Sequence, residues 1–331
     1  MSPPAIIVLV VVTGLLFDFA NGWNDSANAI ATVISTRVLR PFTAIALAAT
    51  LNMLGALLWT EVAKTMARDI IHQADVTQGM VLAAMAAAAL WTAGCTMMGL
   101  PISASHGLIG ALMGAAFVAK GAHVLAWKGL TTIFIALLLS PLVGFLFGWL
   151  LMTTLLFLLR KVSPGIVSRV FGKLQLVSVS FMALSHGTAD AQKVMGVITL
   201  SLIAAGTLPQ GSPPPFWVIL LCAGAMAAGT ATGGWKVIRT LGMRLTDLKP
   251  VHGFAAETAA AMVLLTVSKL GIPVSTTHTI TGSILGVGAT RRLSAVRWGL
   301  TRKILFAWVF TLPGSALIAA GLYLGVRLLI P

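Results

Sequence analysis

The sequence predicts an all-α polytopic membrane protein made of two inverted-topology repeats, each with a broken first helix and a re-entrant helical hairpin. The first reason is composition: charged residues make up 9% of the 331-residue chain, whereas they make up about a quarter of a soluble domain. The second is that several apolar runs approach or exceed the roughly 20 residues with which a helix crosses a bilayer. The third is an unusual peptide that occurs twice, half a chain apart.

The repeated peptide reads GLPISASH at residues 99–106 and GIPVSTTH at residues 271–278, an offset of 172 residues. Each copy lies between two apolar stretches that are short for a full membrane span. A glycine–proline interruption at matching positions of two halves is typical of the binding site of a secondary transporter. We therefore predict helical hairpins over 79–119 and 254–290, with their tips close together.

Other landmarks divide the chain into two similar halves. Gly22 and Asp25 have counterparts 165 residues later, at Gly187 and Asp190, and such self-similarity indicates a duplication. The apolar segments form two sets of five: 5–34, 41–63, 79–98, 103–119 and 129–159, then 174–206, 214–235, 254–270, 275–290 and 301–330. We predict three parts: a first membrane repeat over 1–160, a basic cytoplasmic linker over 161–173 and a second membrane repeat over 174–331.

The basic residues predict how the chain is oriented. If each hairpin enters and leaves on one side, each half crosses the membrane three times, and this odd number inverts the second half. With the N-terminus outside, most lysines and arginines fall in inside loops, which are 37–40, 160–173, 236–249 and 291–303. We therefore predict a multi-pass protein of the plasma (inner) membrane with both termini outside. These loops also account for the net charge of +14, so we expect no nucleic-acid partner.

Acidic residues in apolar segments are candidate ligands for a coupling cation. Asp25 lies in the segment Asn21–Asn28, and a charge at that depth costs roughly 2.5–3.5 kcal/mol without a partner. Asn24 and Asn28 share a helix face, and with Asp25 they offer oxygen ligands that suit Na⁺ or a proton. Gly22 and this polar run favour a break in the helix. The alternative is a polar cluster that only holds helices together.

The second half has a related segment at Ser185–Lys193. Asp190 is again central in a long apolar run. Lys193 lies three residues on, where it would either bind a ligand or simply pair with Asp190. Gln192 offers both an acceptor and donors. Glu257 lies in the arm before the second tip, and because an uncharged residue stands at the equivalent place in the first half, it is an asymmetric candidate for cation coupling.

The hairpin tips are the candidate anion site. A helix that restarts after the proline presents unpaired N–H groups at its positive end, and adjacent hydroxyl groups would complete a cradle for an oxyanion. The hydroxyl-bearing residues of the two tips are Ser103, Ser105, Ser275, Thr276 and Thr277. Ser103 or Ser275 would alternatively act only as a helix N-cap. His106 and His278 lack any zinc-site spacing, so we expect no structural metal, no catalytic residue and no cofactor beyond the coupling ion.

These motifs resemble those of the inorganic phosphate transporter (Pit) family. Residues 21–32, NGWNDSANAIAT, are similar to the family's first Asn-Asp motif, and residues 185–193, SHGTADAQK, to its second. The two tip peptides are similar to the family's paired hairpin tips. The resemblance implies inverted repeats, outside termini and cotransport of inorganic phosphate with Na⁺ or H⁺. It also implies that Asp25, Asp190 and Glu257 match acidic residues of the family.

The residues and the resemblance together predict a secondary active symporter that imports inorganic phosphate by alternating access. Its predicted partners are phosphate, a monovalent cation and the lipid bilayer, and the sequence is compatible with a homodimer. Ala189 stands where the family usually has an asparagine, which leaves the second cation site poorer in ligands. We predict phosphate binding by Ser103, Ser105, Ser275, Thr276, Thr277 and Gln192. We predict cation coupling by Asp25, Asn24, Asn28, Asp190 and Glu257.

The residues leave two other functions open. A sulfate permease of the same family is the nearer one, although phosphate can donate a P–OH hydrogen bond to an aspartate and sulfate cannot. The other is a polytopic membrane enzyme with His106, His278 and Asp190 as an acid–base site. An enzyme does not account for the duplicated tips or the opposed halves, so we predict that the protein is not an enzyme.

Overall fold

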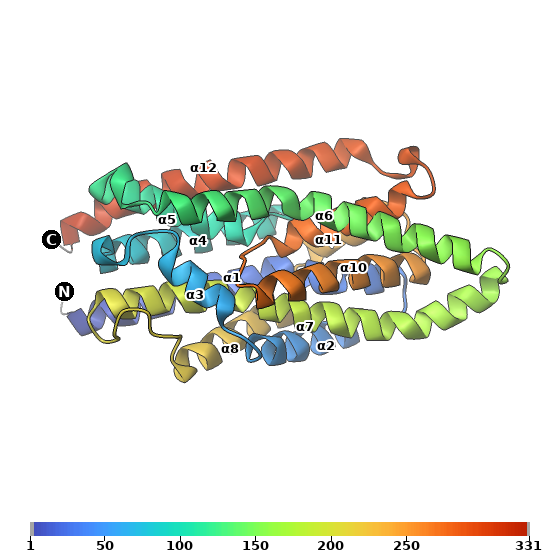
Figure 1. Ribbon diagram of the computed structural model, residues 1–331, viewed down its shortest axis with the longest axis horizontal. Helices are drawn as coiled ribbons and strands as arrows, with labels where there is room; N and C mark the ends of the chain where they lie inside the picture. Colours follow the sequence, from blue (N-terminus) through green and yellow to red (C-terminus); the bar gives the residue numbers. More distant parts are fainter. Residues whose placement is uncertain (1–2, 330–331) are drawn as a thin grey trace.

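The computed structural model describes residues 3–329, which are almost entirely helical and contain no β-strand (Figure 1). Six helices are long and apolar enough to cross a membrane, and up to eight spans result if two bent helix pairs each count as one. The protein is thus an all-α, multi-pass membrane protein, as predicted. The helices are α1 (Pro3–Ser35), α2 (Pro41–Ala56), α3 (Glu61–Arg68), α4 (Gln78–Met98), α5 (Ala104–Lys120), α6 (Trp127–Leu159), α7 (Pro164–Ala204), α8 (Phe216–Thr232), α9 (Trp235–Met243), α10 (Pro250–Lys269), α11 (Thr276–Ala289) and α12 (Trp298–Leu329).

The helix ends follow the local sequence. α4 begins after Thr77, whose side chain accepts a hydrogen bond from the Met80 backbone N–H at 3.3 Å. α7 and α10 begin with prolines, which suit this position because the first N–H groups of a helix have no intrahelical partner. Gly99 (φ 74°) ends α4, and Gly271 (φ 72°) follows α10. Both have the left-handed conformation that glycine adopts without a steric penalty.

The predicted break in the first helix of each half is wrong. α1 and α7 are continuous through Gly22 and Gly187. These glycines serve close packing instead: a Cβ atom on Gly22 would lie 2.2 Å from the Met226 carbonyl oxygen of α8, and one on Gly187 would lie 2.1 Å from the Asn52 carbonyl oxygen of α2. Two helix backbones approach this closely only where a side chain is absent. The two glycines therefore mark helix crossings and not helix ends.

The bends lie in the second apolar segment of each half. α2 and α3 are bent by 68° relative to each other, and α8 and α9 by 72°. The short helices α3 and α9 hold the hairpin tips. Thr65 of α3 donates to the Gly271 carbonyl oxygen at 2.7 Å, and Thr240 of α9 donates to the Gly99 carbonyl oxygen at 3.0 Å. Each tip is thereby held by the opposite half of the chain.

The two halves use the same set of helix contacts. α1 packs against α4 and α8, and its counterpart α7 packs against α10 and α2. Likewise α6 packs against α11, and α12 against α5. α1 and α7 contact each other, and both chain ends lie at the same end of the molecule (Figure 1). A two-fold relation between the halves would explain why the first helix of each half packs against the second helix of the other half. The inverted orientation of the halves in the membrane stays a prediction.

The outer surface fits a lipid environment. α6 and α12 expose large apolar side chains, for example Leu138 (73% exposed) and Leu317 (75% exposed). The polar side chains in the middle of α1 and α7 are buried, as a helix surrounded by others in a membrane requires. Residues 164–173 of the predicted linker are the helical start of α7. The repeat boundaries, the side of the membrane on which the termini lie and the homodimer stay predictions.

Candidate functional site

The helices that follow the two tips are capped by serines. The Ser103 hydroxyl oxygen accepts a hydrogen bond from the His106 backbone N–H at 3.2 Å, and that of Ser275 accepts one from the His278 N–H, also at 3.2 Å. Both serines thus satisfy N–H groups that the first turn of a helix leaves free. Ser103 and Ser275 therefore act as helix N-caps, which was the alternative role for them. Their direct contact with an anion stays a prediction.

The two tips lie against each other, as predicted. The Ser105 hydroxyl donates to the Val274 carbonyl oxygen at 3.2 Å. Lys193 of α7 reaches the same place, because its ammonium group donates to Ser105 Oγ at 2.6 Å and to the Val274 carbonyl oxygen at 2.9 Å. Lys193 also forms an ion pair with Asp190. It therefore joins α7 to both tips as well as neutralising its acidic neighbour.

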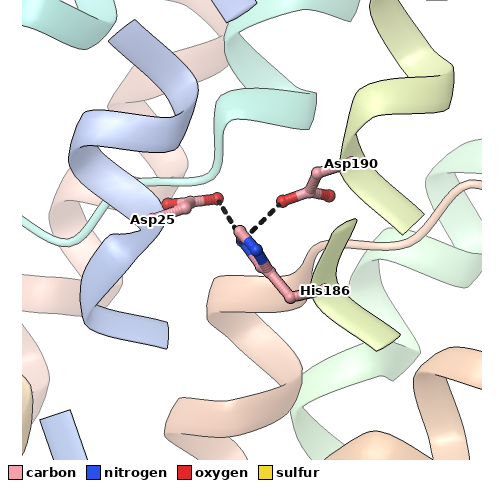
Figure 2. Close-up of side chains that lie close together, drawn as sticks. All are labelled: Asp25, His186 and Asp190. Carbon is pink, nitrogen blue, oxygen red and sulfur yellow. Dashed lines mark ion pairs between the residues drawn. The ribbon is translucent and has the colours of Figure 1, made fainter. Parts of the chain in front are cut away.

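Asp25 of α1 and Asp190 of α7 lie on either side of His186 (Figure 2). The His186 Nε2 atom is 3.2 Å from Asp190 Oδ2 and 3.9 Å from Asp25 Oδ2. The three side chains are at most 2% exposed. The sequence motifs did not point to His186, although its position four residues before Asp190 places both side chains on one helix face.

Hydroxyl groups of the second tip bind these carboxylates. Thr276 donates to Asp190 Oδ2 at 2.8 Å, and Thr277 donates to Asp25 Oδ1 at 3.1 Å. The Asn28 amide in turn donates to Thr277 Oγ1 at 3.0 Å. The predicted anion-binding residues and the predicted cation-binding residues therefore meet in one place. We call these five residues, together with Ser105, His186 and Lys193, the central cluster.

The protonation of His186 is constrained by Asn52 of α2. His186 Nδ1 lies 3.2 Å from Asn52 Oδ1, and the Asn52 amide nitrogen donates to Thr230 Oγ1 at 2.9 Å. Because Asn52 Oδ1 is an acceptor, Nδ1 carries a proton, and the lone pair of a neutral ring then lies on Nε2. This nitrogen faces the Asp190 carboxylate. A proton between this nitrogen and the carboxylate, or a cation bound by both, would remove the repulsion between the two lone pairs.

The central cluster can hold a cation. Asp25, His186 and Asp190 each offer one ligand atom, and these atoms lie within 4.8 Å of one another. With both carboxylates ionised, Lys193 protonated and His186 neutral, the cluster carries one net negative charge. An uncompensated charge at this depth costs several kcal/mol. A metal ion bound by the three residues, or a proton on His186, would each balance it.

Two predicted ligand residues bond elsewhere. Gln192 Oε1 accepts from the Val62 backbone N–H at 2.8 Å, and so satisfies the N-terminus of α3. The Asn24 amide donates to Thr96 Oγ1 of α4 at 2.8 Å. Both residues position helices around the central cluster and are not bonded to its members. Their contacts with phosphate and the cation stay predictions.

Glu257 forms a separate buried group between α1, α7 and α10. Its carboxylate accepts from Thr32 at 2.5 Å and from the Gln175 amide at 2.9 Å, and also from the Ser178 hydroxyl. Thr32 follows Asp25 by seven residues on α1, which is about 10 Å along the helix. Glu257 is thus a second acidic position, two helical turns from the central cluster.

His106 and His278 pack behind the tips. Their ring centroids are 4.8 Å apart, and the His278 ring stacks on Trp308 at 3.7 Å. The Trp308 indole N–H donates to the Pro101 carbonyl oxygen at 2.9 Å. Within residues 3–329, neither histidine is bonded to Asp190, so the geometry gives no support to the acid–base site considered for an enzyme.

A cavity of about 800 Å³ reaches the second tip. The tip residues 270–273 line it, together with Thr65 and Arg68 of α3 and Lys128 near the start of α6. Asp69 is the one acidic residue among those that line it. α6 begins at the end of the molecule where both chain ends lie (Figure 1). Arg68 and Lys128 give the lining of this cavity an excess of basic over acidic side chains, which favours the approach of anions.

The fold and the central cluster define a class of protein. Paired helical hairpins whose tips meet at a buried, charged site between two halves of a multi-pass bundle are typical of secondary transporters. The comparisons with known proteins give the family. The chain belongs to the phosphate transporter family, whose model matches residues 21–319. The resemblance to phosphate transporters found in the sequence is thereby confirmed, and the protein is a transporter and not an enzyme.

Individual relatives agree with this assignment. The chain is 44% identical over 324 residues to a probable low-affinity inorganic phosphate transporter of Rhizobium meliloti (strain 1021), covering 98% of this chain and 97% of the relative. It is 41% identical to a protein of the same description from Bacillus subtilis (strain 168), covering 96% of each. A solved structure described as the sodium-dependent phosphate transporter matches with a TM-score of 0.91 at 25% identity, over 98% of this chain and 100% of that one.

Proposed function

We propose that the protein imports inorganic phosphate by alternating access, in cotransport with Na⁺ or H⁺. The observation that supports this most is the central cluster, in which hydroxyl donors, an ammonium group and two carboxylates share one buried site formed by both halves. Membership of the phosphate transporter family supports phosphate as the anion. The similarity to a sodium-dependent transporter supports a cation as its partner.

The shared hydroxyl groups offer a mechanism for coupling. Thr276 and Thr277 donate to the carboxylates of Asp190 and Asp25, and a hydroxyl group has only one hydrogen to donate. The same hydrogens cannot bind phosphate at the same time. A cation between the carboxylates would take their place and free both hydroxyl groups. Each ligand would then strengthen the binding of the other, so that phosphate binds tightly only when the cation is present.

The remaining anion donors surround the same place. Ser105 and Lys193 are in direct contact there, and α5 and α11 both begin at the tips. The N-termini of these two helices would add backbone N–H groups and the positive ends of their dipoles. The ammonium group of Lys193 would offset part of the charge of the anion, and the coupling cation would offset more.

Phosphate suits this site better than sulfate. Near neutral pH phosphate keeps a P–OH group, which can donate to Asp25 or Asp190, whereas sulfate has no proton to donate to either carboxylate. Sulfate is the second candidate because it shares the tetrahedral shape and the acceptor oxygens. It is therefore the competitor that a transport experiment has to include.

Uptake of labelled phosphate into proteoliposomes tests the proposal. A Na⁺ gradient and a pH gradient are imposed separately at the same membrane potential, and excess sulfate is added to a parallel sample. We expect one of the gradients to drive accumulation, and sulfate to leave it unchanged. Uptake that follows neither gradient would reject cotransport, and strong competition by sulfate would reject selectivity for phosphate.

Thr277→Ala should weaken phosphate binding because it removes one of the shared hydroxyl groups. A hydrogen bond to a charged ligand contributes about 1.5–3 kcal/mol, so we expect a roughly 10- to 150-fold higher Kd. Thr279→Ala is a matched control on the same helix, since the Thr279 hydroxyl donates to the backbone of Ser275 at 2.9 Å. Calorimetric titration with phosphate compares the variants. Equal affinities of Thr277→Ala and the wild type would remove Thr277 from the anion site.

The cavity at the second tip would be the route by which phosphate arrives. With both termini outside, as the basic loops predict, this cavity opens to the outside of the plasma membrane. The double variant Arg68→Gln/Lys128→Gln should then raise the KM for uptake about three-fold at low ionic strength and have little effect in about 0.5 M salt, because salt screens long-range attraction. Arg302→Gln, on α12 and away from the cavity lining, is the control. A rise in KM that is independent of salt would contradict electrostatic attraction.

A further inference from the structure

Asp18 of α1 is a buried carboxylate that the mechanism above does not use. Its side chain is 0% exposed, and neither carboxylate oxygen has a hydrogen-bond partner among the described residues. Asn21 of the same helix and the Cys222 thiol of α8 are the nearest possible donors to the Asp18 carboxylate, but neither lies in hydrogen-bonding geometry with it. Asn21 is also buried, and its Oδ1 atom likewise has no partner within the described part of the chain. Two orphaned oxygen-bearing side chains therefore lie side by side in the helix bundle.

A structural role does not account for Asp18. A polar residue that holds membrane helices together does so through hydrogen bonds or an ion pair, and Asp18 makes neither among residues 3–329. Asp190 and Lys193 of α7 interact electrostatically with the Asp18 carboxylate from a longer distance. Lys193 cannot bond to it directly, because all three donors of its ammonium group are already bonded. α4 packs against α1 and carries no acid or base except the Cys95 thiol. An isolated carboxylate at this depth costs several kcal/mol when ionised.

Asp18 continues a polar face of α1 that passes through the central cluster. Positions 18, 21, 25, 28 and 32 follow one another at spacings of three and four residues, so their side chains lie on one face of the helix. All five side chains are at most 1% exposed. Asp18 and Thr32 lie seven residues before and after Asp25, which is about 10 Å in each direction.

We propose that Asp18, together with the amide oxygen of Asn21, is a further binding position for the coupling cation, a proton or Na⁺, on the N-terminal side of the central cluster. This inference rests on the proposed symport. Glu257, which is bonded to Thr32, lies on the other side of the cluster. The cation would move along one face of α1, from Asp18 past Asn21 to Asp25. The three acidic positions extend over about 20 Å of a hydrocarbon core that is about 30 Å thick.

Asp18→Asn tests this directly, because it keeps the shape of the side chain and removes its charge. For Na⁺, the thermal stability of the purified protein is followed against Na⁺ concentration, with choline as the inert cation. For a proton, infrared difference spectroscopy follows the protonated carboxyl band as the pH changes. If the cation is Na⁺, we expect Asp18→Asn to need a roughly five-fold or higher Na⁺ concentration for half-maximal stabilisation. If the cation is a proton, we expect this variant to lose one pH-dependent carboxyl band. Asp75→Asn, at a partly exposed ion pair with Lys120, is the matched control and should leave the Na⁺ dependence of the stability unchanged.

Transport measurements distinguish this inference from the proposed function. Exchange of phosphate for phosphate needs no net movement of the cation, so Asp18→Asn should retain it while uptake driven by the gradient falls roughly ten-fold or more. If the wild-type protein carries no phosphate, the proposed function is rejected. The Na⁺ dependence of the stability and the carboxyl band would still decide whether Asp18 binds a cation. Wild-type signals and wild-type uptake in Asp18→Asn would overturn the inference. If that variant does not fold, Asn21→Ala replaces it, with smaller shifts expected in the same direction and no shift as the contrary result.

Discussion

Asp25→Asn should reduce phosphate uptake about 100-fold or more. The substitution preserves the size of the side chain and one oxygen ligand, but it removes the charge that would neutralise the coupling cation. Losing one partner of a buried charge pair costs about 3–5 kcal/mol, and at 1.4 kcal/mol for each factor of ten the lower value already corresponds to about 100-fold. Thr277 also loses the charged acceptor to which it donates at 3.1 Å.

The measurement is the initial rate of uptake by Asp25→Asn in proteoliposomes, recorded against Na⁺ concentration and against pH. Asp75→Asn, which removes a carboxylate from a partly exposed ion pair with Lys120, controls for the loss of an acidic residue as such. A wild-type rate with wild-type cation dependence would show that Asp25 only holds helices together. The coupling mechanism through Thr276 and Thr277 would then have to be abandoned.

Lys193→Met should destabilise the protein by about 3–5 kcal/mol, because Asp190 would stay buried without its ion-pair partner. The variant also loses the bonds to Ser105 and to the Val274 carbonyl oxygen, and with them the link between α7 and the two tips. Thermal unfolding of the purified protein in detergent measures the effect, and we expect a midpoint lower by on the order of 10 °C.

A double variant separates the two causes of this loss. In Asp190→Asn/Lys193→Met no charge of the pair remains, so most of the stability should return, while transport should stay low because the anion and cation ligands are gone. A double variant that is as unstable as Lys193→Met alone would show that the bonds to the tips carry the stability. Wild-type stability in Lys193→Met itself would show that neither the ion pair with Asp190 nor the bonds to the tips stabilise the protein.

The membrane spans and the hairpin tips could be predicted because their signals are local. The predicted segments 79–98 and 103–119 agree with α4 and α5 to within one residue at each end. A run of apolar residues interrupted by glycine and proline specifies a helix end without reference to any distant part of the chain. The same holds for the capping serines, whose side chains bond N–H groups three residues away.

The positions of the bends could be predicted only in part. The polar residues of α1 suggested a break, but Asp25 and Asn28 bond to the distant second tip and the helix continues. The bend between α2 and α3 falls at residues 57–60, where the sequence Leu-Leu-Trp-Thr contains no helix-breaking residue. The glycine pair at 233–234 does mark the bend between α8 and α9, so this bend has a local signal in the sequence.

The candidate site could likewise be predicted only in part. Asp25, Asp190 and the threonines of the second tip, which the structure brings together, could be selected as candidates because charges and repeated hydroxyl groups are rare in apolar segments. The role of Gln192 could not, since it depends on the approach of α3. Asp18 has the same local signature as Asp25, since it is an acidic residue inside a long apolar run. Its lack of any partner among the described residues is visible only in three dimensions.

The partners of Asp25 also determine when the protein can be completed during synthesis. Its carboxylate faces His186, Thr276 and Thr277, all of which the ribosome adds after the whole first half. Until the second hairpin enters the membrane, the first helix therefore holds an acidic side chain without these partners, which favours its protonated form or a position near the membrane surface. The last hairpin to be made thus completes the surroundings of Asp25, so the first half reaches its final structure only after the second half has been synthesised.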